Sequence, residues 1–285
     1  MTRLSLISLV LIYLLIIPPF TAYLKERPVT VKLGYLPEAQ VLKVALADYR
    51  NLLAQYAVVK VLFYYGTLVE QFEHKVKQQP EYFNMFKTMQ TAIKLDPYNM
   101  DAYYFTQAAF TWELQRVKEV NNMLDYGMKY RTWDYQLPFY AGFNAAYFQK
   151  DYKAAARYMQ KAAELSGQSL FTNLAARYFY EAGQTGLGLL FLETMERGAK
   201  DENVRRLYTV RREALAGVAK IEKAVGEYRT KRGRTPAKLQ DLVDADFLRE
   251  IPRDPYGGSF YIDMDGSVKS TSKFAFTSSG KKTDR

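Results

Sequence analysis

The sequence has no cysteine and only one histidine among its 285 residues. The lack of cysteine excludes disulfides, thiolate metal sites, cysteine nucleophiles and a lipid-modified N-terminal cysteine. The single histidine, His74, excludes a multi-histidine zinc site. No glycine-rich phosphate loop follows a strand pattern, and no pair of carboxylates stands out as an acid and a base. We therefore expect a protein without enzyme activity or cofactor, and a carboxylate-only hydrolase is the catalytic alternative.

Dense runs of basic residues are also missing. The chain carries 40 Lys and Arg against 30 Asp and Glu, a net charge of +10. Residues 197–285 hold 20 basic and 13 acidic residues, so most of the excess lies there. Such a bias can favour anionic lipid head groups, acidic proteins or nucleic acid, or it can belong to a solvated surface. Since no Lys and Arg run is long enough for a nucleic-acid arm, a nucleic-acid partner is not expected.

Tyrosine and phenylalanine are abundant, with 24 Tyr and 17 Phe beside only 2 Trp. With 48% hydrophobic residues, the chain is long enough to bury a core. Tyrosine combines an apolar ring with a polar tip, which suits groove walls and half-buried helix faces. A disordered chain would not carry this much aromatic area.

The N-terminus contains an apolar run over residues 4–17, which continues past Pro18 and Pro19 to Leu24. The unbroken core has the length of a signal-peptide hydrophobic region, whereas the full segment approaches the ~20 residues of a spanning helix. Because a small-residue cleavage site is poorly formed, we expect an uncleaved signal anchor. A cleaved signal peptide and a buried soluble helix are the alternatives.

Arg3 on a short tail favours a cytoplasmic N-terminus, although Lys25, Arg27 and Lys32 on the other flank oppose it. In a bacterium this orientation would give a single-pass protein of the inner membrane with its bulk in the periplasm.

Small residues recur about every 35 positions along the middle of the chain. They are Ala92, Gly127, Ala162 and Gly198, and hydrophobic residues stand three and seven positions before each of them. Paired helices explain this spacing, because a small residue lets neighbouring helices approach closely. An irregular helical bundle with accidental periodicity is the alternative.

The clearest unit runs over residues 139–165. It has an aromatic opening, Gly142, a turn at Asp151 and small residues at Ala155 and Ala162. This pattern resembles the tetratricopeptide repeat, whose period is ~34 residues of helix–turn–helix. The unit departs from the family at Ala146, where a tyrosine is usual. The resemblance implies a mainly α, helical-repeat solenoid with helices near 82–96, 100–114, 116–130, 136–149, 152–165, 169–182 and 187–198.

Upstream, residues 37–76 read as a long helical stretch that begins near Glu38 after Pro37.

In the C-terminal part of the chain, the helical-repeat pattern gives way to turn and strand patterns. An amphipathic helix ends at Gly233, Thr235 and Pro236 have the pattern of a helix start, and Asp254-Pro255-Tyr256-Gly257-Gly258 has turn chemistry. Two strand patterns then flank the turn at 263–266. This order is similar to the C-terminal part of the major pseudopilins of type II secretion. The resemblance implies a small α+β module that docks against the last repeat or against a secretion component. Asp263 and Asp265 are weak calcium candidates, since two carboxylates on a glycine-containing turn more often belong to the turn alone.

These signals divide the chain into five expected segments. They are an anchor helix at 1–24, a linker at 25–36, repeats at 37–215, the pseudopilin-like module at 216–272 and a flexible tail at 273–285.

The tetratricopeptide resemblance implies a concave groove for a protein partner. Mapped onto the first helix of each pair, the groove residues are Phe105, Ala109, Trp112, Tyr140, Asn144, Tyr147, Arg177 and Phe179. Asn144 falls where chaperone-binding members keep an asparagine for a peptide carboxylate, but Tyr140 replaces their lysine. An aromatic groove for an extended or helical peptide therefore fits better than a carboxylate clamp. Packing of these aromatics between helices is the alternative.

Together these expectations describe a non-enzymatic, membrane-anchored interaction scaffold. The pseudopilin resemblance makes a pilus, secretion or cell-envelope assembly its expected setting. The first alternative is a self-associating structural subunit of such an assembly. The second is a binder of anionic lipid or nucleic acid through the basic half of the chain.

Overall fold

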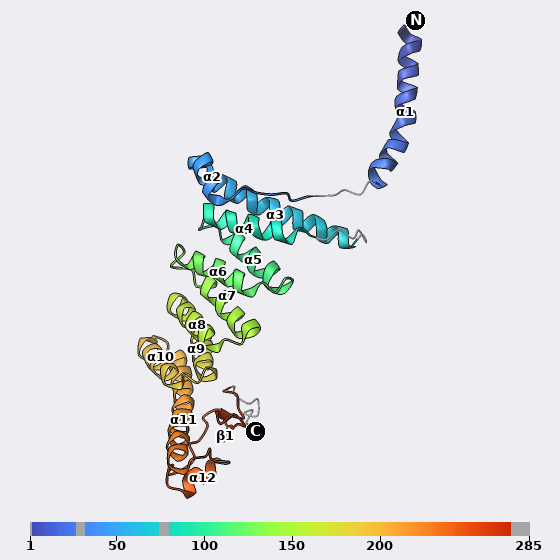
Figure 1. The fold of residues 1–285 in the computed structure, drawn as a ribbon. Coiled ribbons are helices and arrows are strands. Elements are labelled where there is room, and N and C mark those ends of the chain that lie inside the picture. Colours follow the sequence, from blue (N-terminus) through green and yellow to red (C-terminus); the bar gives the residue numbers. More distant parts are fainter. Residues whose placement is uncertain (1, 27–31, 74–79, 275–285) are drawn as a thin grey trace, which may run out of the picture. The chain divides into compact units, whose positions relative to one another are not determined.

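A computed structural model describes residues 2–26, 32–73 and 80–274 of the chain (Figure 1). His74 and residues 275–285 lie outside the described residues. The fold is mainly helical with one two-stranded antiparallel sheet near the C-terminus, which confirms the expected fold class at this level. The chain divides into two compact units, Met1–Leu95 and Asp96–Arg285, which are described separately.

In its described residues, the first unit contains four α-helices, three of which pack around a small core. Its elements are α1 (Thr2–Glu26), α2 (Ala39–Leu46), the 3-10 turn η1 (Ala47–Tyr49), α3 (Arg50–Glu73) and α4 (Tyr82–Leu95). Ala39, Ala54 and Leu95 meet where α2, α3 and α4 pack together. The expected helix start near Glu38 is confirmed, since Glu38 is the N-cap of α2, and the helical stretch is divided at Ala47, whose φ of 43° ends α2.

The helix α1 covers the expected anchor and contains Pro18 and Pro19. Its aliphatic side chains, such as Leu9, Leu15 and Ile16, are exposed. Within the described part of the chain, no helix is both long and apolar enough to cross a membrane. The anchor at residues 1–24 is therefore unsupported by the structure and stays a prediction from the sequence.

The second unit begins with a succession of helices, each of which packs against the next along the chain (Figure 1). They are α5 (Met100–Trp112), α6 (Val117–Met128), α7 (Gln136–Asn144) with the π-helical turn η2 (Ala145–Gln149), α8 (Tyr152–Ser166), α9 (Ser169–Glu181), α10 (Thr185–Gly198) and α11 (Glu202–Arg232). The expected helices agree with these bounds to within two residues. Caps explain the starts: Asn99 accepts from the Ala102 N–H, and Asp151 from the Ala154 N–H.

The small residues of the 35-residue period do not all act alike. A Cβ on Gly127 would lie 2.7 Å from Cζ of the buried Tyr103, so this glycine permits close packing of its helix. Ala92 and Ala162 are fully buried, as expected. Gly198 is exposed and a Cβ there would meet nothing within 4 Å, so its expected packing role is wrong.

The C-terminal residues share one core with the preceding helices. The helix α11 runs without a break past residue 216 and ends at Gly233, whose φ of 71° suits a glycine. The short α12 (Leu239–Asp244) follows, and its start lies later than expected from Thr235. The reason is Asp241, whose Oδ2 accepts the backbone N–H groups of Ala237 and Lys238.

The expected hairpin is confirmed as β1 (Phe260–Ile262) paired antiparallel with β2 (Val268–Ser270). Phe260 and Val268 pack in the same cluster as Tyr180 of α9 and Tyr208 of α11. The Tyr180 hydroxyl also donates to the Val268 carbonyl at 2.9 Å. Hydrogen bonds and apolar contacts therefore hold the hairpin against α9 and α11.

A buried carboxylate explains the Asp-Pro-Tyr-Gly-Gly sequence. Asp254 Oδ1 accepts the Tyr256 N–H at 2.9 Å, which closes the turn. Its Oδ2 accepts the hydroxyls of Ser270 and Ser272, so the turn is tied to the end of β2. Gly258 is required beside it, since a Cβ there would lie 2.6 Å from the Ser272 nitrogen.

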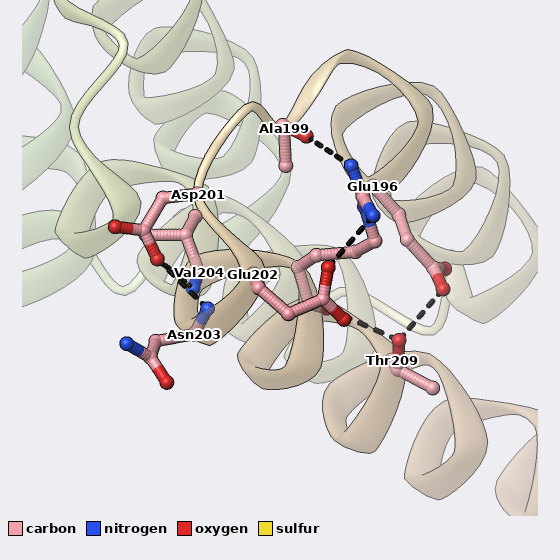
Figure 2. Close-up of polar contacts among 8 residues, drawn as sticks. Glu196, Ala199, Asp201, Glu202, Asn203, Val204 and Thr209 are labelled. Atoms are coloured by element: carbon pink, nitrogen blue, oxygen red, sulfur yellow. Dashed lines mark hydrogen bonds and ion pairs between the residues drawn. The ribbon is translucent and has the colours of Figure 1, made fainter.

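Polar contacts fix the turn between α10 and α11 (Figure 2). Asp201 Oδ1 accepts the N–H groups of Asn203 and Val204 and caps α11. Glu196 accepts from the Thr209 hydroxyl at 2.7 Å and from Arg212 Nε at 2.6 Å. The Arg212 hydrogen bond is the main reason that the pKa of Glu196 lies below its usual value of 4.5.

This contact predicts a pH-dependent contribution to stability. Because the folded-state pKa is lowered, ionised Glu196 stabilises the fold above about pH 4.5, and this contribution is lost as pH falls through the folded-state pKa. We expect Glu196→Gln to lower the free energy of unfolding at pH 7 and to weaken its decline towards pH 3, measured by urea unfolding. Arg212→Gln should likewise lower the free energy of unfolding at pH 7 and weaken its decline towards pH 3. Curves parallel to the wild type at every pH would contradict this role.

Candidate aromatic binding surface

Four aromatic rings form one exposed cluster in the second unit. We call Trp112, Phe143, Tyr147 and Phe148 the aromatic patch. The centroid of the Trp112 ring lies 5.6 Å from that of Tyr147 and 5.0 Å from that of Phe148. Phe143 and Tyr147 stack at 5.4 Å with an interplanar angle of 9°. Trp112 is 52% exposed and Tyr147 53%, whereas Phe143 and Phe148 are half-buried beside them.

The ends of two helices position these rings. Trp112 is the last residue of α5, and Phe143 lies near the end of α7. The chain then continues in the π-helical turn η2, which carries Tyr147 and Phe148. Such turns contain one extra residue and are frequent at functional sites. Lys150 ends the turn with a φ of 55°, and its ammonium lies 5.4 Å from the Tyr147 ring centroid.

A buried amide network lies in the same helices. Gln107 of α5 and Asn144 of α7 exchange two hydrogen bonds, Nε2 to Oδ1 at 2.9 Å and Nδ2 to Oε1 at 2.7 Å. Asn144 Nδ2 also donates to Asn121 Oδ1 of α6 at 2.8 Å. All three side chains are buried. Since the network links three helices, it fixes how α5 and α7, which carry the patch, are placed against α6.

The structure brings only part of the expected groove together. Trp112 and Tyr147 meet in the aromatic patch. Tyr140 lies apart from them, half-buried beside Tyr104 and Phe139, and burial raises the pKa of its hydroxyl. Arg177 is exposed on α9.

Four of the expected groove residues are buried instead. Phe105, Ala109 and Asn144 pack within the helical layers, whereas Phe179, although buried, lines a groove between α8 and α10. The Asn144 side chain in particular is buried and donates hydrogen bonds to Gln107 and Asn121, so it does not face a ligand. The burial of Phe105, Ala109 and Asn144 favours the alternative, in which these side chains pack between helices.

A second aromatic cluster was missed by the sequence analysis. Trp133 and Tyr98 stack at 6.1 Å with an interplanar angle of 10°, and both are more than half exposed. Arg131 holds them in place: it pairs with the buried Asp134 at 2.8 Å and donates to the Tyr98 carbonyl. The only available signal was a tryptophan in a short segment between two expected helices.

Metal ligation finds no support in the described part of the chain, where no group of three or more His, Cys, Asp and Glu side chains is gathered. Asp265 accepts the backbone N–H and the hydroxyl of Ser267, which lowers its pKa. Asp263 accepts the Met264 N–H. The two carboxylates therefore hold the hairpin turn.

No family model matches the chain, and no curated protein or solved structure is found to be similar to it. The likenesses to tetratricopeptide repeats and to pseudopilins therefore stay predictions from the sequence.

Proposed function

We propose that this chain is a non-enzymatic scaffold that binds a protein partner through the aromatic patch. The observation that carries the proposal is the exposure of Trp112 and Tyr147 within one cluster of four rings. Clustered exposed aromatic area is uncommon on monomeric surfaces and marks interaction sites. Tryptophan and tyrosine are also the residues that most often dominate binding energy at interfaces.

The surroundings of the patch support a preformed binding surface. The buried network of Gln107, Asn121 and Asn144 connects the helices that carry the rings. A surface that is ordered before binding loses less side-chain entropy on association. The tetratricopeptide-like succession of helix pairs belongs to the same proposal, because such repeats present helix faces to extended or helical peptides. A pilus, secretion or envelope assembly is the proposed setting, on the strength of the pseudopilin-like C-terminal sequence.

The test is a comparison of partner capture by crosslinking in the native cell. We expect Trp112→Ala combined with Tyr147→Ala to reduce the captured partner by about tenfold or more, since residues of this kind each contribute at least ~2 kcal/mol at a binding centre. Trp133→Ala is the matched control, because Trp133 is similarly exposed but lies in the other aromatic cluster.

Two results would contradict the proposal. One is unchanged capture by the double variant, which would assign these rings to packing. The other is capture of nothing except further copies of this chain, which would favour the self-associating subunit. Thermal unfolding of both variants shows whether the fold is retained.

A further inference from the structure

A second surface on the same unit lies between α8 and α10. Both helices pack on α9, and the space between them is a groove with a volume of about 400 Å³. Its floor is aromatic, formed by Phe179 and Phe191, and belongs to the core cluster of α8, α9 and α10. One wall runs from Lys153 to Glu164, which corresponds to ~16 Å of helix at 1.5 Å per residue.

The two walls differ in chemistry. From α10, Leu187 and Leu190 line the groove although they are 52% and 62% exposed. From α8, Lys153 and Arg157 line it one helical turn apart, and neither forms an ion pair with another described residue. Lys161 extends this basic stripe by another turn along α8. The one acidic lining residue, Glu164, accepts a hydrogen bond from Gln160 at 2.9 Å.

We propose that this groove binds an acidic amphipathic helix. Apolar residues of such a helix, spaced i, i+4 and i+7, would cover Leu187, Leu190 and the aromatic floor. Its glutamates or aspartates would lie against Lys153 and Arg157. The groove wall is about three helical turns long, which accommodates the ~10 Å, or about two turns, between the i and i+7 anchors. Charge complementarity, as well as apolar area, therefore selects this occupant over a basic or neutral helix.

The experiment uses the full chain and a fluorescein-labelled synthetic helix with leucine at i, i+4 and i+7 and glutamate beside them. We expect saturable binding by fluorescence anisotropy that weakens as salt is raised. Lys153→Glu with Arg157→Glu should weaken binding by about tenfold or more, since it reverses two pairings. Lys223→Glu with Arg229→Glu is the matched control, because it changes net charge equally at exposed positions of α11.

Further variants and a second probe distinguish binding in this groove from binding at the aromatic patch. Leu187→Ser with Leu190→Ser should also weaken binding, whereas Trp112→Ala with Tyr147→Ala should leave it unchanged. A probe with lysine in place of glutamate should bind far more weakly. The proposal is overturned if the glutamate probe shows no saturable binding, if both probes bind equally, or if the Lys153 and Arg157 variant binds as the wild type does. Loss of binding in the aromatic-patch variant alone would also overturn it.

Discussion

Asn144→Leu should lower the free energy of unfolding of the second unit by about 3 kcal/mol, because it leaves two buried polar groups unpaired. The Gln107 amide NH₂ loses its acceptor and the Asn121 carbonyl loses its donor. Each such group costs ~1–3 kcal/mol. Both tryptophans lie in this unit, so urea unfolding followed by tryptophan fluorescence measures it directly.

A neighbouring asparagine provides the control for this prediction. Asn122 is exposed, and Asn122→Leu should change stability by no more than ~0.5 kcal/mol. Gln107→Leu should cost less in the Asn144→Leu chain than in the wild type, because there it removes one of the two unpaired groups and leaves only the Thr111 hydroxyl without its acceptor. Fully additive costs for the two substitutions would show that Gln107 and Asn144 do not act as a pair.

Gly127→Ala should have the second large effect and lower the free energy of unfolding by about 2 kcal/mol. The new methyl group would lie 2.7 Å from Cζ and 2.8 Å from Cε1 of Tyr103. That ring is fully buried and its hydroxyl donates to the Pro97 carbonyl, so it cannot turn away freely. Overpacking costs ~1–3 kcal/mol, and the better helix propensity of alanine offsets only part of it.

At another helical glycine, the same substitution is expected to raise the free energy of unfolding. Gly226 lies inside α11, where an added Cβ meets nothing within 4 Å, so Gly226→Ala should stabilise by up to ~1 kcal/mol. The two substitutions are chemically identical, so thermal unfolding of the pair isolates the packing against Tyr103. A stabilising Gly127→Ala would contradict the close approach of the helices.

The helix succession was predictable because its signals are local. Capping residues such as Asp151, a terminal glycine such as Gly233 and the apolar spacing of each helix all act within a few residues of the sequence. The hairpin was predictable for the same reason, since the turn at 263–266 and its flanking strands are contiguous.

The candidate site was only partly predictable, because its decisive contacts join residues far apart in the chain. The hydrogen bonds between Gln107 and Asn144 span 37 residues and turn an expected ligand contact into an internal one. The π-helical turn after α7 determines how Tyr147 and Phe148 meet Trp112. No residue type in the sequence predicts such a turn. The stacking of Tyr98 on Trp133 likewise depends on Arg131, whose partners are set by the fold.

The aromatic patch and the groove between α8 and α10 give the second unit two surfaces of different chemistry. The patch has exposed aromatic rings with Lys150 near Tyr147, and the groove has leucines beside Lys153 and Arg157. Under the two proposals together, the chain would bind two segments at once, which would raise the overall affinity if a single partner carried them.

Site-specific photo-crosslinking at Tyr147 tests the central claim most directly. A photoreactive phenylalanine analogue replaces Tyr147 in one chain and the fully exposed Met264 of the hairpin turn in the other, and both are irradiated in the native cell. The scaffold proposal predicts a discrete adduct with a different protein from position 147 and none from position 264. Equal labelling from the two positions, or adducts of this chain with itself alone, would contradict it.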